Sequence, residues 1–462
     1  MNAPFLLLLL SLFISLIAFA LRDQVRWSST WVSLSMGILA GMVLLVGFDE
    51  PYGLLGLSVK LPSQWGILGR SLGIGGEIRP LIGYLYLATA FMVAPAWIAG
   101  APRYFTSIVP LMLAAVAASL MVQPFLFAAI FIVLAAMGAV LLLVSPGTRS
   151  TSGAMRLLIL YSLAMIIVLV TGWQLETSGV TSASGSLATQ VTALLAFGFA
   201  ILLAIPPFHI WLPRVVQEAN VYVVFFVAVI LQAAGLFFLF RFLDTYPWLR
   251  ESPALFSGIA WTGGITVLLA ALWAAGQREP RTMSAYCLLA DLGVMLVAIG
   301  NGSRAGLELA LGISGARVIS LAVLSLGMGY LMRVEGSSSW RGAGFRRPLA
   351  SMTFLVGLLS IIGYPLTAGF PARWSLLAAI RGGEPLLSWV IILAMMLLTG
   401  STLRWAAFLF SPSEDIQRHN TPLTVSLFLY GGIAVTVVLG VFPQVIFPWV
   451  VETAAGLTRL FP

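Results

Sequence analysis

Charge is scarce in this 462-residue sequence: Asp, Glu, Lys and Arg make up 9% of it, whereas hydrophobic residues make up 60%. A water-soluble protein of this length needs far more charge to cover its surface. The chain has one lysine, Lys60, one cysteine, Cys287, and two histidines, His209 and His419. A single cysteine excludes an intrachain disulfide and a CxxC metal or iron–sulfur site, and two distant histidines do not support bis-histidine haem ligation. We therefore expect no metal and no bound cofactor.

Long apolar runs take the place of charge along the whole chain. A run of about 17 or more apolar residues can cross a bilayer as a helix, and such runs predict an all-α polytopic membrane protein with about fourteen transmembrane helices. The first run lacks a basic start and a small-residue cleavage site, so we expect a retained span rather than a signal peptide. The predicted spans are residues 4–21, 30–48, 80–99, 104–122, 125–145, 155–172, 187–206, 221–242, 254–275, 283–300, 305–332, 349–370, 386–410 and 422–441.

The net charge of +8 comes from arginines in short loops. A preference of basic residues for the cytoplasmic side explains these loops better than a nucleic-acid partner does. Successive loops must lie on alternate sides of the membrane. With this assignment, both termini fall on the side that has fewer basic residues. We therefore expect a multi-pass protein of the inner (cytoplasmic) membrane, embedded in lipid bilayer, with both termini on the outer side.

Prolines interrupt the seventh and the twelfth predicted spans. Pro206 and Pro207 open the segment PPFHIWLPRVVQEAN, and Pro365 and Pro371 lie in GYPLTAGFPARW at residues 363–374. Proline removes a backbone donor and clashes with the preceding turn, so each pair should break its helix. Broken backbone inside a bilayer survives only where protein or water satisfies the freed polar groups.

The two interruptions lie five spans apart, at corresponding places in two halves of the chain. Such a pair predicts two inverted five-helix repeats around a site at mid-membrane depth. The expected organisation has helices 1–3 with an external loop in residues 1–103, and helices 4–8 of the first repeat in 104–253. The second repeat, helices 9–13, occupies 254–410, and helix 14 with an interfacial tail occupies 411–462. The segment WGILGRSLGI is expected to form a short hairpin in the external loop.

Several motifs resemble those of one known family. The segment PPFHIWLPRVVQEANVYVVFFVAVILQAAGLFFLFRF is similar to the signature that begins PFHxWLPD in the antiporter-like membrane subunits of complex I. Relatives of these subunits occur in membrane-bound hydrogenases and in multisubunit cation/proton antiporters. EPRTMSAYCLLADLGVMLVAIG, SIIGYPLTAGFPARW and LGVFPQ resemble further motifs of the family in the same order. The resemblance covers roughly residues 120–445 and looks nearest to the subunit called N of NADH:quinone oxidoreductase.

The resemblance implies a mechanism in which buried lysines and a glutamate pass protons along a hydrated line at mid-membrane depth. In this chain the lysines of the seventh, eighth and twelfth spans are replaced by Leu202, Gln232 and Arg373. Arg317 stands where many relatives have a lysine in the eleventh span, and residues 125–145 have no ionisable residue in place of the glutamate. Arginine keeps the charge but does not readily release its proton.

The sequence leaves five candidates for an altered proton path: His209, Gln232, Asp291, Arg317 and Arg373. His209 follows the first interruption and suits either a proton relay or a cap for freed carbonyls. Asp291 lies in an apolar helix, where an arginine partner such as Arg317 or Arg281 should neutralise it. Gln232 can hydrogen-bond water but carries no net charge.

These features favour an antiporter-like membrane-arm subunit of a complex-I-type NADH:quinone oxidoreductase. It would be associated with redox-coupled proton translocation through an altered or impaired path, would hold no catalytic residue, and would assemble with other membrane subunits. Two alternatives stay open. One is a non-conducting scaffold in a related membrane hydrogenase or cation/proton antiporter assembly, and the other is a stand-alone secondary transporter with its substrate at the two breaks.

Overall fold

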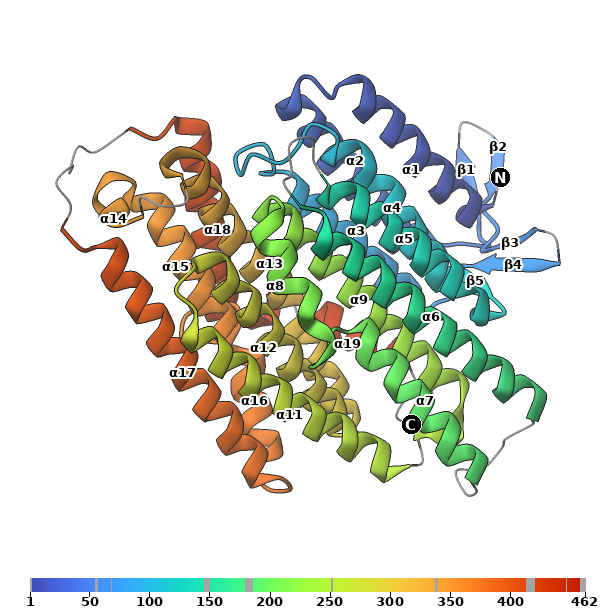
Figure 1. Ribbon diagram of the computed structural model, residues 1–462. Helices are drawn as coiled ribbons and strands as arrows, with labels where there is room; N and C mark the ends of the chain where they lie inside the picture. The colour runs from blue at the N-terminus through green and yellow to red at the C-terminus, as the bar shows by residue number, and fades with distance from the viewer. Residues whose placement is uncertain are drawn as a thin grey trace.

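Apolar helices packed side by side make up most of the protein (Figure 1). The computed structural model describes residues 2–54, 57–67, 69–144, 150–178, 186–250, 252–336, 340–412, 420–445 and 447–457. Hydrophobic helices with little charge satisfy their own backbone hydrogen bonds, as a chain in lipid requires. The prediction of an all-α polytopic membrane protein is confirmed.

The chain order of the helices can be followed by colour in Figure 1. The first half holds α1 (Ala3–Ala20), α2 (Val25–Leu45), α3 (Arg79–Val93), α4 (Phe105–Met121), α5 (Ala128–Leu143), α6 (Ser152–Ser178), α7 (Ser186–Leu202), α8 (Trp211–Glu218), α9 (Val221–Thr245) and α10 (Pro247–Arg250). The second half holds α11 (Pro253–Gly276), α12 (Pro280–Gly300), α13 (Arg304–Glu335), α14 (Ala343–Arg346), α15 (Pro348–Ile362), α16 (Phe370–Ile380), α17 (Pro385–Leu409), α18 (Leu423–Val441) and α19 (Phe447–Gly456).

The helices match the predicted spans in position. Within the described ranges, nine helices are long and apolar enough to cross a membrane, and shorter apolar helices occupy Arg79–Val93, Phe105–Met121, Ala128–Leu143, Ala188–Leu202 and Pro348–Ile362. Each of the fourteen predicted ranges overlaps one helix of these two groups. Because the shorter helices fall below the usual length for a full crossing, the count of fourteen spans stays a prediction.

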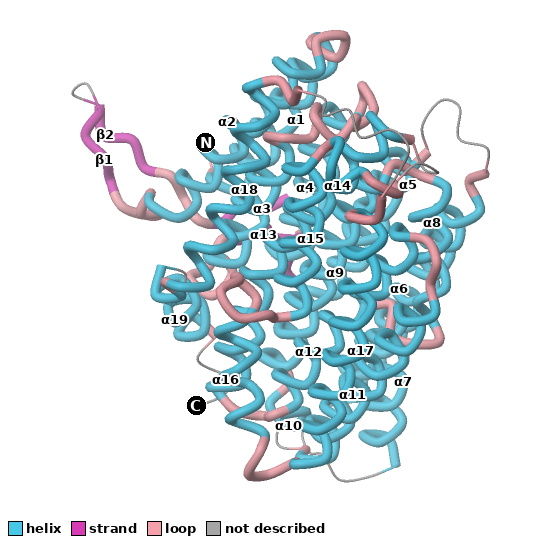
Figure 2. The backbone as a smooth tube through the Cα atoms, turned by 90° about the vertical axis from the view of Figure 1, so that its left-hand side faces the viewer, coloured by secondary structure: helices cyan, strands magenta, loops and turns pink. Residues whose placement is uncertain are grey.

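Short strands form two small antiparallel elements between α2 and α3. Strands β1 (Pro51–Leu54) and β2 (Leu57–Lys60) pair with each other, and this ribbon projects from the bundle (Figure 2). Strands β3 (Gln64–Ile67) and β4 (Arg70–Gly73) form the hairpin expected of WGILGRSLGI, and β4 also pairs with β5 (Val122–Gln123) after α4.

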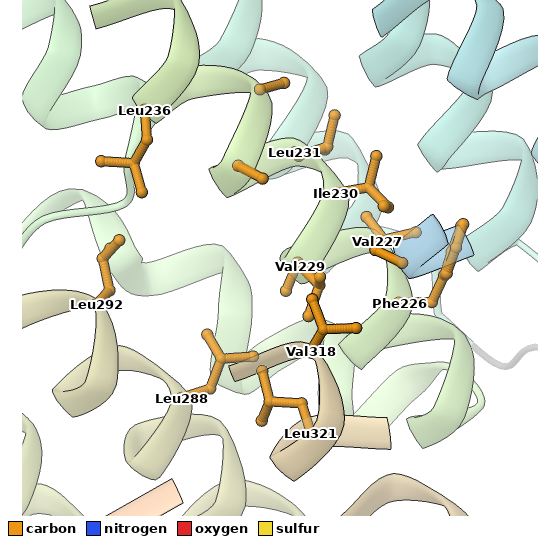
Figure 3. Close-up of a cluster of buried hydrophobic side chains, with 14 of the residues drawn as sticks. Phe226, Val227, Val229, Ile230, Leu231, Leu236, Leu288, Leu292, Val318 and Leu321 are labelled. Atoms are coloured by element: carbon orange, nitrogen blue, oxygen red, sulfur yellow. The ribbon is translucent and has the colours of Figure 1, made fainter. Parts of the chain in front are cut away.

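Helix α9 forms the centre of the bundle. An apolar 18-residue stretch of α9 is entirely buried, whereas only 17% of the corresponding stretch of α18 is buried. A helix that is apolar on every face must be surrounded by other apolar surfaces. Figure 3 shows Val229 of α9 near Leu288 of α12 and Val318 of α13, and all three side chains are buried. Polar side chains on α9 therefore face other helices of the protein instead of lipid.

Two sets of five helices pack in the same order. In the first set α4 packs on α5 and α6 packs on α7, while in the second α11 packs on α12 and α13 packs on α15. The last helix of each set, α9 or α17, returns to contact the first. This parallel supports the predicted pair of repeats, whose inverted relation and boundaries stay predictions.

The first interruption begins earlier than its prolines. Helix α7 ends at Leu202, Ala204 has a φ of +59°, and a 3-10 turn at Phe208–Ile210 leads into α8. Proline disfavours helical backbone at the residue before it as well as its own hydrogen bond. The helix therefore stops before Pro206 instead of running to it, as the predicted span 187–206 had assumed.

The second interruption is a seven-residue segment between α15 and α16. Gly363 closes α15 in the left-handed region with φ +88°, where glycine carries no steric penalty. Pro365 lies in this segment, while Pro371 lies in the first turn of α16. A proline in a first turn is well tolerated because the amide it lacks has no intrahelical partner there. The interruption is therefore confined to residues 363–369, and the predicted span 349–370 covers α15, the interruption and the first residue of α16.

Candidate functional site

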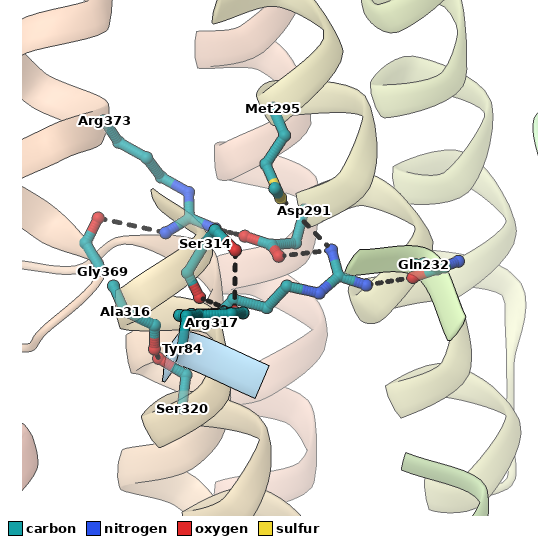
Figure 4. Close-up of polar contacts among 10 residues, drawn as sticks. All are labelled: Tyr84, Gln232, Asp291, Met295, Ser314, Ala316, Arg317, Ser320, Gly369 and Arg373. Atoms are coloured by element: carbon teal, nitrogen blue, oxygen red, sulfur yellow. Dashed lines mark hydrogen bonds and ion pairs between the residues drawn. The ribbon is translucent and has the colours of Figure 1, made fainter. Parts of the chain in front are cut away.

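A line of polar side chains crosses the buried centre of the bundle from α9 through α13 and α12 to α16 (Figure 4). We call its four members, Gln232, Arg317, Asp291 and Arg373, the central cluster. The Asp291 side chain is fully buried, and those of Arg317 and Arg373 are 3% exposed. Gln232 is buried as well. The structure thus brings together four of the five residues that the sequence singled out, although they come from four separate helices.

Asp291 binds one guanidinium group with each of its carboxylate oxygens. Its Oδ2 accepts a hydrogen bond from Nη1 of Arg317 at 2.8 Å, and its Oδ1 accepts from Nη2 of Arg373. The expected pairing with Arg317 is confirmed, and the second partner is Arg373 instead of Arg281. A carboxylate in a bilayer-spanning bundle needs such partners because an unpaired charge there is costly.

Each arginine has a further partner that holds it in place. Nη2 of Arg317 donates to Oε1 of Gln232, and Nη1 of Arg373 donates to the carbonyl of Gly369 at 3.0 Å. Gly369 is the residue that precedes α16 at the second interruption. The central cluster is therefore attached to α9 at one end and to a helix break at the other.

The cluster carries an excess of positive charge. Two guanidinium groups contribute two positive charges, the Asp291 carboxylate contributes one negative charge, and Gln232 is neutral, which leaves one positive charge. An arginine keeps its proton under all ordinary conditions, unlike a buried lysine. The arrangement can hold a fixed positive charge and orient dipoles, but it offers no basic nitrogen that releases and regains a proton.

Tyr84 of α3 contacts the same region, and the sequence analysis missed it. Its hydroxyl donates to the carbonyl of Ser314, with 3.0 Å between the oxygens, and lies 2.7 Å from the Ser314 hydroxyl. Ser314 is one turn before Arg317 on α13. The Tyr84 ring stacks on Trp449 of α19, with 5.2 Å between ring centroids. Nothing in the local pattern of α3 marks this tyrosine, because its role depends on contacts with distant segments.

The first interruption has a different chemical character. His209 is buried apart from the central cluster, and its ring stacks on Trp273 of α11 with 4.5 Å between centroids. Its Nδ1 makes no hydrogen bond, so this nitrogen does not cap a freed carbonyl. Leu202, at the family's lysine position, is fully buried. His419, the second histidine, lies outside the described residues.

The first interruption nevertheless packs close to one end of the cluster. Leu202 and Leu203 pack against Gly235 of α9, which is less than one turn from Gln232. Residues three apart on a helix lie on nearly the same face. The Nε2 of Gln232 is buried without a hydrogen-bond partner. The polar line therefore stops at an unpaired amide group, next to an apolar helix break.

The charge balance of the cluster predicts unequal effects of two substitutions. Asp291→Asn leaves two buried cations without a counter-charge and should lower the free energy of unfolding by about 3–5 kcal/mol. Arg373→Gln leaves the neutral pair of Asp291 and Arg317 and should cost about 1–2 kcal/mol through lost hydrogen bonds. Thermal unfolding in detergent measures both. An equal or larger effect of Arg373→Gln would contradict the charge assignment.

Comparison with known proteins identifies relatives of this chain. A family model described as "NADH:quinone oxidoreductase/Mrp antiporter, TM" matches residues 157–399. A subunit N of NADH-quinone oxidoreductase from Rhodococcus opacus (strain B4) is 30% identical over 270 residues, which are 56% of this chain and 49% of that protein. The subunit N from Ectopseudomonas mendocina (strain ymp) is 28% identical over 309 residues, 62% of this chain and 60% of that protein. The chain thus matches about half the length of these curated relatives.

Solved structures show the same fold over nearly the whole chain. A chain of the archaeal membrane-bound sulfane sulfur reductase superposes with a TM-score of 0.84 at 17% identity, covering 99% of this chain and 98% of the other. A chain of respiratory complex I from Thermus thermophilus superposes with a TM-score of 0.81 at 18% identity, covering 98% of this chain and 100% of the other. A chain of the Mrp complex from Dietzia superposes with a TM-score of 0.80 at 18% identity, covering 99% of this chain and 98% of the other. With the family model matching more than half of the residues, this chain belongs to the NADH:quinone oxidoreductase/Mrp antiporter transmembrane family.

Proposed function

We propose that the chain is an antiporter-like membrane-arm subunit of a complex-I-type NADH:quinone oxidoreductase, and that it does not relay protons through its own centre. The observation that carries this proposal is the position of Asp291 between Arg317 and Arg373, with one guanidinium on each oxygen. Family membership supports the first half of the proposal, and the chemistry of the cluster supports the second.

A proton relay needs groups that gain and lose a proton during turnover. Neither arginine of the cluster does so, and both oxygens of Asp291 are engaged by charged donors. The excess positive charge also opposes the entry of a hydrated proton. Leu202 offers no polar group at the first interruption. The centre of the chain is thus suited to a fixed electrostatic element.

A subunit that does not relay protons can still have a structural role, because it can pack against other membrane subunits of the arm. Helices α17 and α18 expose long apolar faces, including Trp389, Met396, Leu423 and Leu427. Such faces suit either lipid or the helices of other membrane subunits. We propose that neighbouring membrane subunits cover part of this surface. The central cluster would then fix the positions of the helices that these subunits contact, without conducting protons.

Proton stoichiometry in the native assembly tests the proposal. Arg373→Gln and Gln232→Leu should each leave the number of protons moved per electron pair unchanged once activity is normalised to assembled complex, because neither residue relays a proton. Arg278→Gln, an exposed loop substitution with the same loss of charge as Arg373→Gln, is the matched control. A drop in stoichiometry for both cluster variants, with the control unaffected, would establish a relay through the cluster.

We also propose that both termini face the outer side of the membrane. Two spans separate the N-terminus from the β1–β2 ribbon, so this orientation puts the ribbon on the outer side too. Lys60 is exposed at the end of β2 and is the chain's only lysine. A membrane-impermeant amine reagent applied to intact spheroplasts should modify Lys60, identified at the peptide level, and Lys60→Arg should abolish the signal. Labelling that requires permeabilisation would reverse the orientation.

A further inference from the structure

A cavity of about 500 Å³ lies where the ends of four helices meet the loop between α3 and α4. Val25 at the start of α2, Val221 at the start of α9, Arg281 at the start of α12 and Arg333 at the end of α13 all line it. Trp97 from the loop forms another wall. None of the four central-cluster residues lines this cavity, so it is a separate feature of the fold.

The cavity wall is positively charged and has no acidic residue among its lining side chains. Within the described part of the chain, neither Arg281 nor Arg333 forms an ion pair. The Nε of Arg281 is buried and makes no hydrogen bond. Glu279 acts on Arg281 through its charge but forms no ion pair with it, and it accepts a hydrogen bond from Thr282 at 3.2 Å. Two arginines on a cavity wall, neither of them held in an ion pair, fit an anionic ligand.

Hydrogen bonds hold the walls in position before any ligand arrives. Nη1 of Arg333 donates to the carbonyl of Trp97 at 2.8 Å, which fixes the guanidinium against the loop. Nδ2 of Asn220 donates to the carbonyl of Gly100 at 2.9 Å and joins the start of α9 to the same loop. A preformed site loses less conformational entropy when it binds its ligand.

Residues from the N-terminal ends of three helices line the cavity. Helices α2, α9 and α12 each place a first-turn residue on its wall, namely Val25, Val221 and Arg281. The N-terminal end of a helix carries partial positive charge and favours anions, above all phosphate groups. Helix α13 presents its C-terminal end, where Arg333 offsets the partial negative charge, and Ala219, the C-cap residue of α8, also lines the cavity. The three helix N-termini and the two arginines therefore favour an anionic ligand.

The place of the cavity in the bundle suits a lipid headgroup. It lies at the ends of membrane-spanning helices, on the side whose loops are richer in arginine. The Arg26 guanidinium lies over the Trp97 ring, 5.4 Å from its centroid, and tryptophan prefers the boundary between headgroups and acyl chains. Basic pockets between transmembrane helices on the cytoplasmic side are suited to anionic headgroups.

We infer that this cavity binds a phosphate-bearing anion, with Arg281 and Arg333 contacting the phosphate and the helix N-termini contributing to its field. The phosphate belongs to the headgroup of an anionic phospholipid on the arginine-rich side of the membrane. The site would attach the chain to the lipid boundary independently of whether the central cluster relays protons.

Binding of labelled phosphatidylglycerol to the purified, delipidated assembly tests this inference. Arg281→Gln should weaken binding about fivefold, the contribution expected of one basic residue near a headgroup. Arg278→Gln removes the same charge from an exposed position three residues away that does not line the cavity, and it should leave binding unchanged. Thermal unfolding without added lipid checks that both variants fold equally well.

Two competitors distinguish the source of the phosphate. Phosphatidylcholine, whose headgroup has no net charge, should not displace the labelled lipid. Failure of inorganic phosphate to displace it assigns the cavity to a headgroup, whereas displacement at equal concentration assigns the same site to soluble phosphate. If Arg278→Gln and Arg281→Gln weakened lipid binding equally, the effect would come from general surface charge and the inference would be wrong. The absence of any specific lipid binding would also overturn it.

Discussion

Neutralising one buried carboxylate is the constraint around which the centre of this protein is organised. Asp291 lies in an apolar helix with no water-exposed surface of its own, and an isolated charge there would be too costly to retain. Arg317 and Arg373 approach it from two other helices, and each is held by a further acceptor. The relative positions of α9, α12, α13 and α16 are therefore coupled through one network of hydrogen bonds and ion pairs.

The two helix breaks contribute differently to this network. The second break supplies both an arginine and a backbone acceptor, because α16 starts after a segment that a left-handed glycine makes possible. The first break is lined by Leu202 and Leu203, and its histidine stacks on an indole instead of joining the cluster. A relay that uses both breaks would need His209, the ionisable group of the first break, to join the central cluster. This asymmetry favours a fixed electrostatic centre over a continuous proton path.

The sequence predicted the helices well because long apolar runs can be stable in lipid only as helices. It also predicted an arginine partner for Asp291, since a carboxylate in such a run needs one. Local patterns could not predict that Arg373 also pairs with Asp291 or that Gln232 accepts a hydrogen bond from Arg317, because these contacts join residues far apart in the chain. The role of Tyr84 is hidden for the same reason. The early end of α7 reflects the effect of Pro206 on the residues before it, which a count of apolar positions does not register.

The most direct test of the fixed-charge account is the protonation state of Asp291 during turnover. Isotope-edited infrared difference spectra of the working assembly, with Asp291→Asn used to assign the signal, report whether this carboxyl group gains a proton. The account predicts an ionised carboxylate throughout turnover, because both of its oxygens accept hydrogen bonds from guanidinium groups. A protonated carboxyl signal from Asp291 that rises and falls with electron transfer would contradict it.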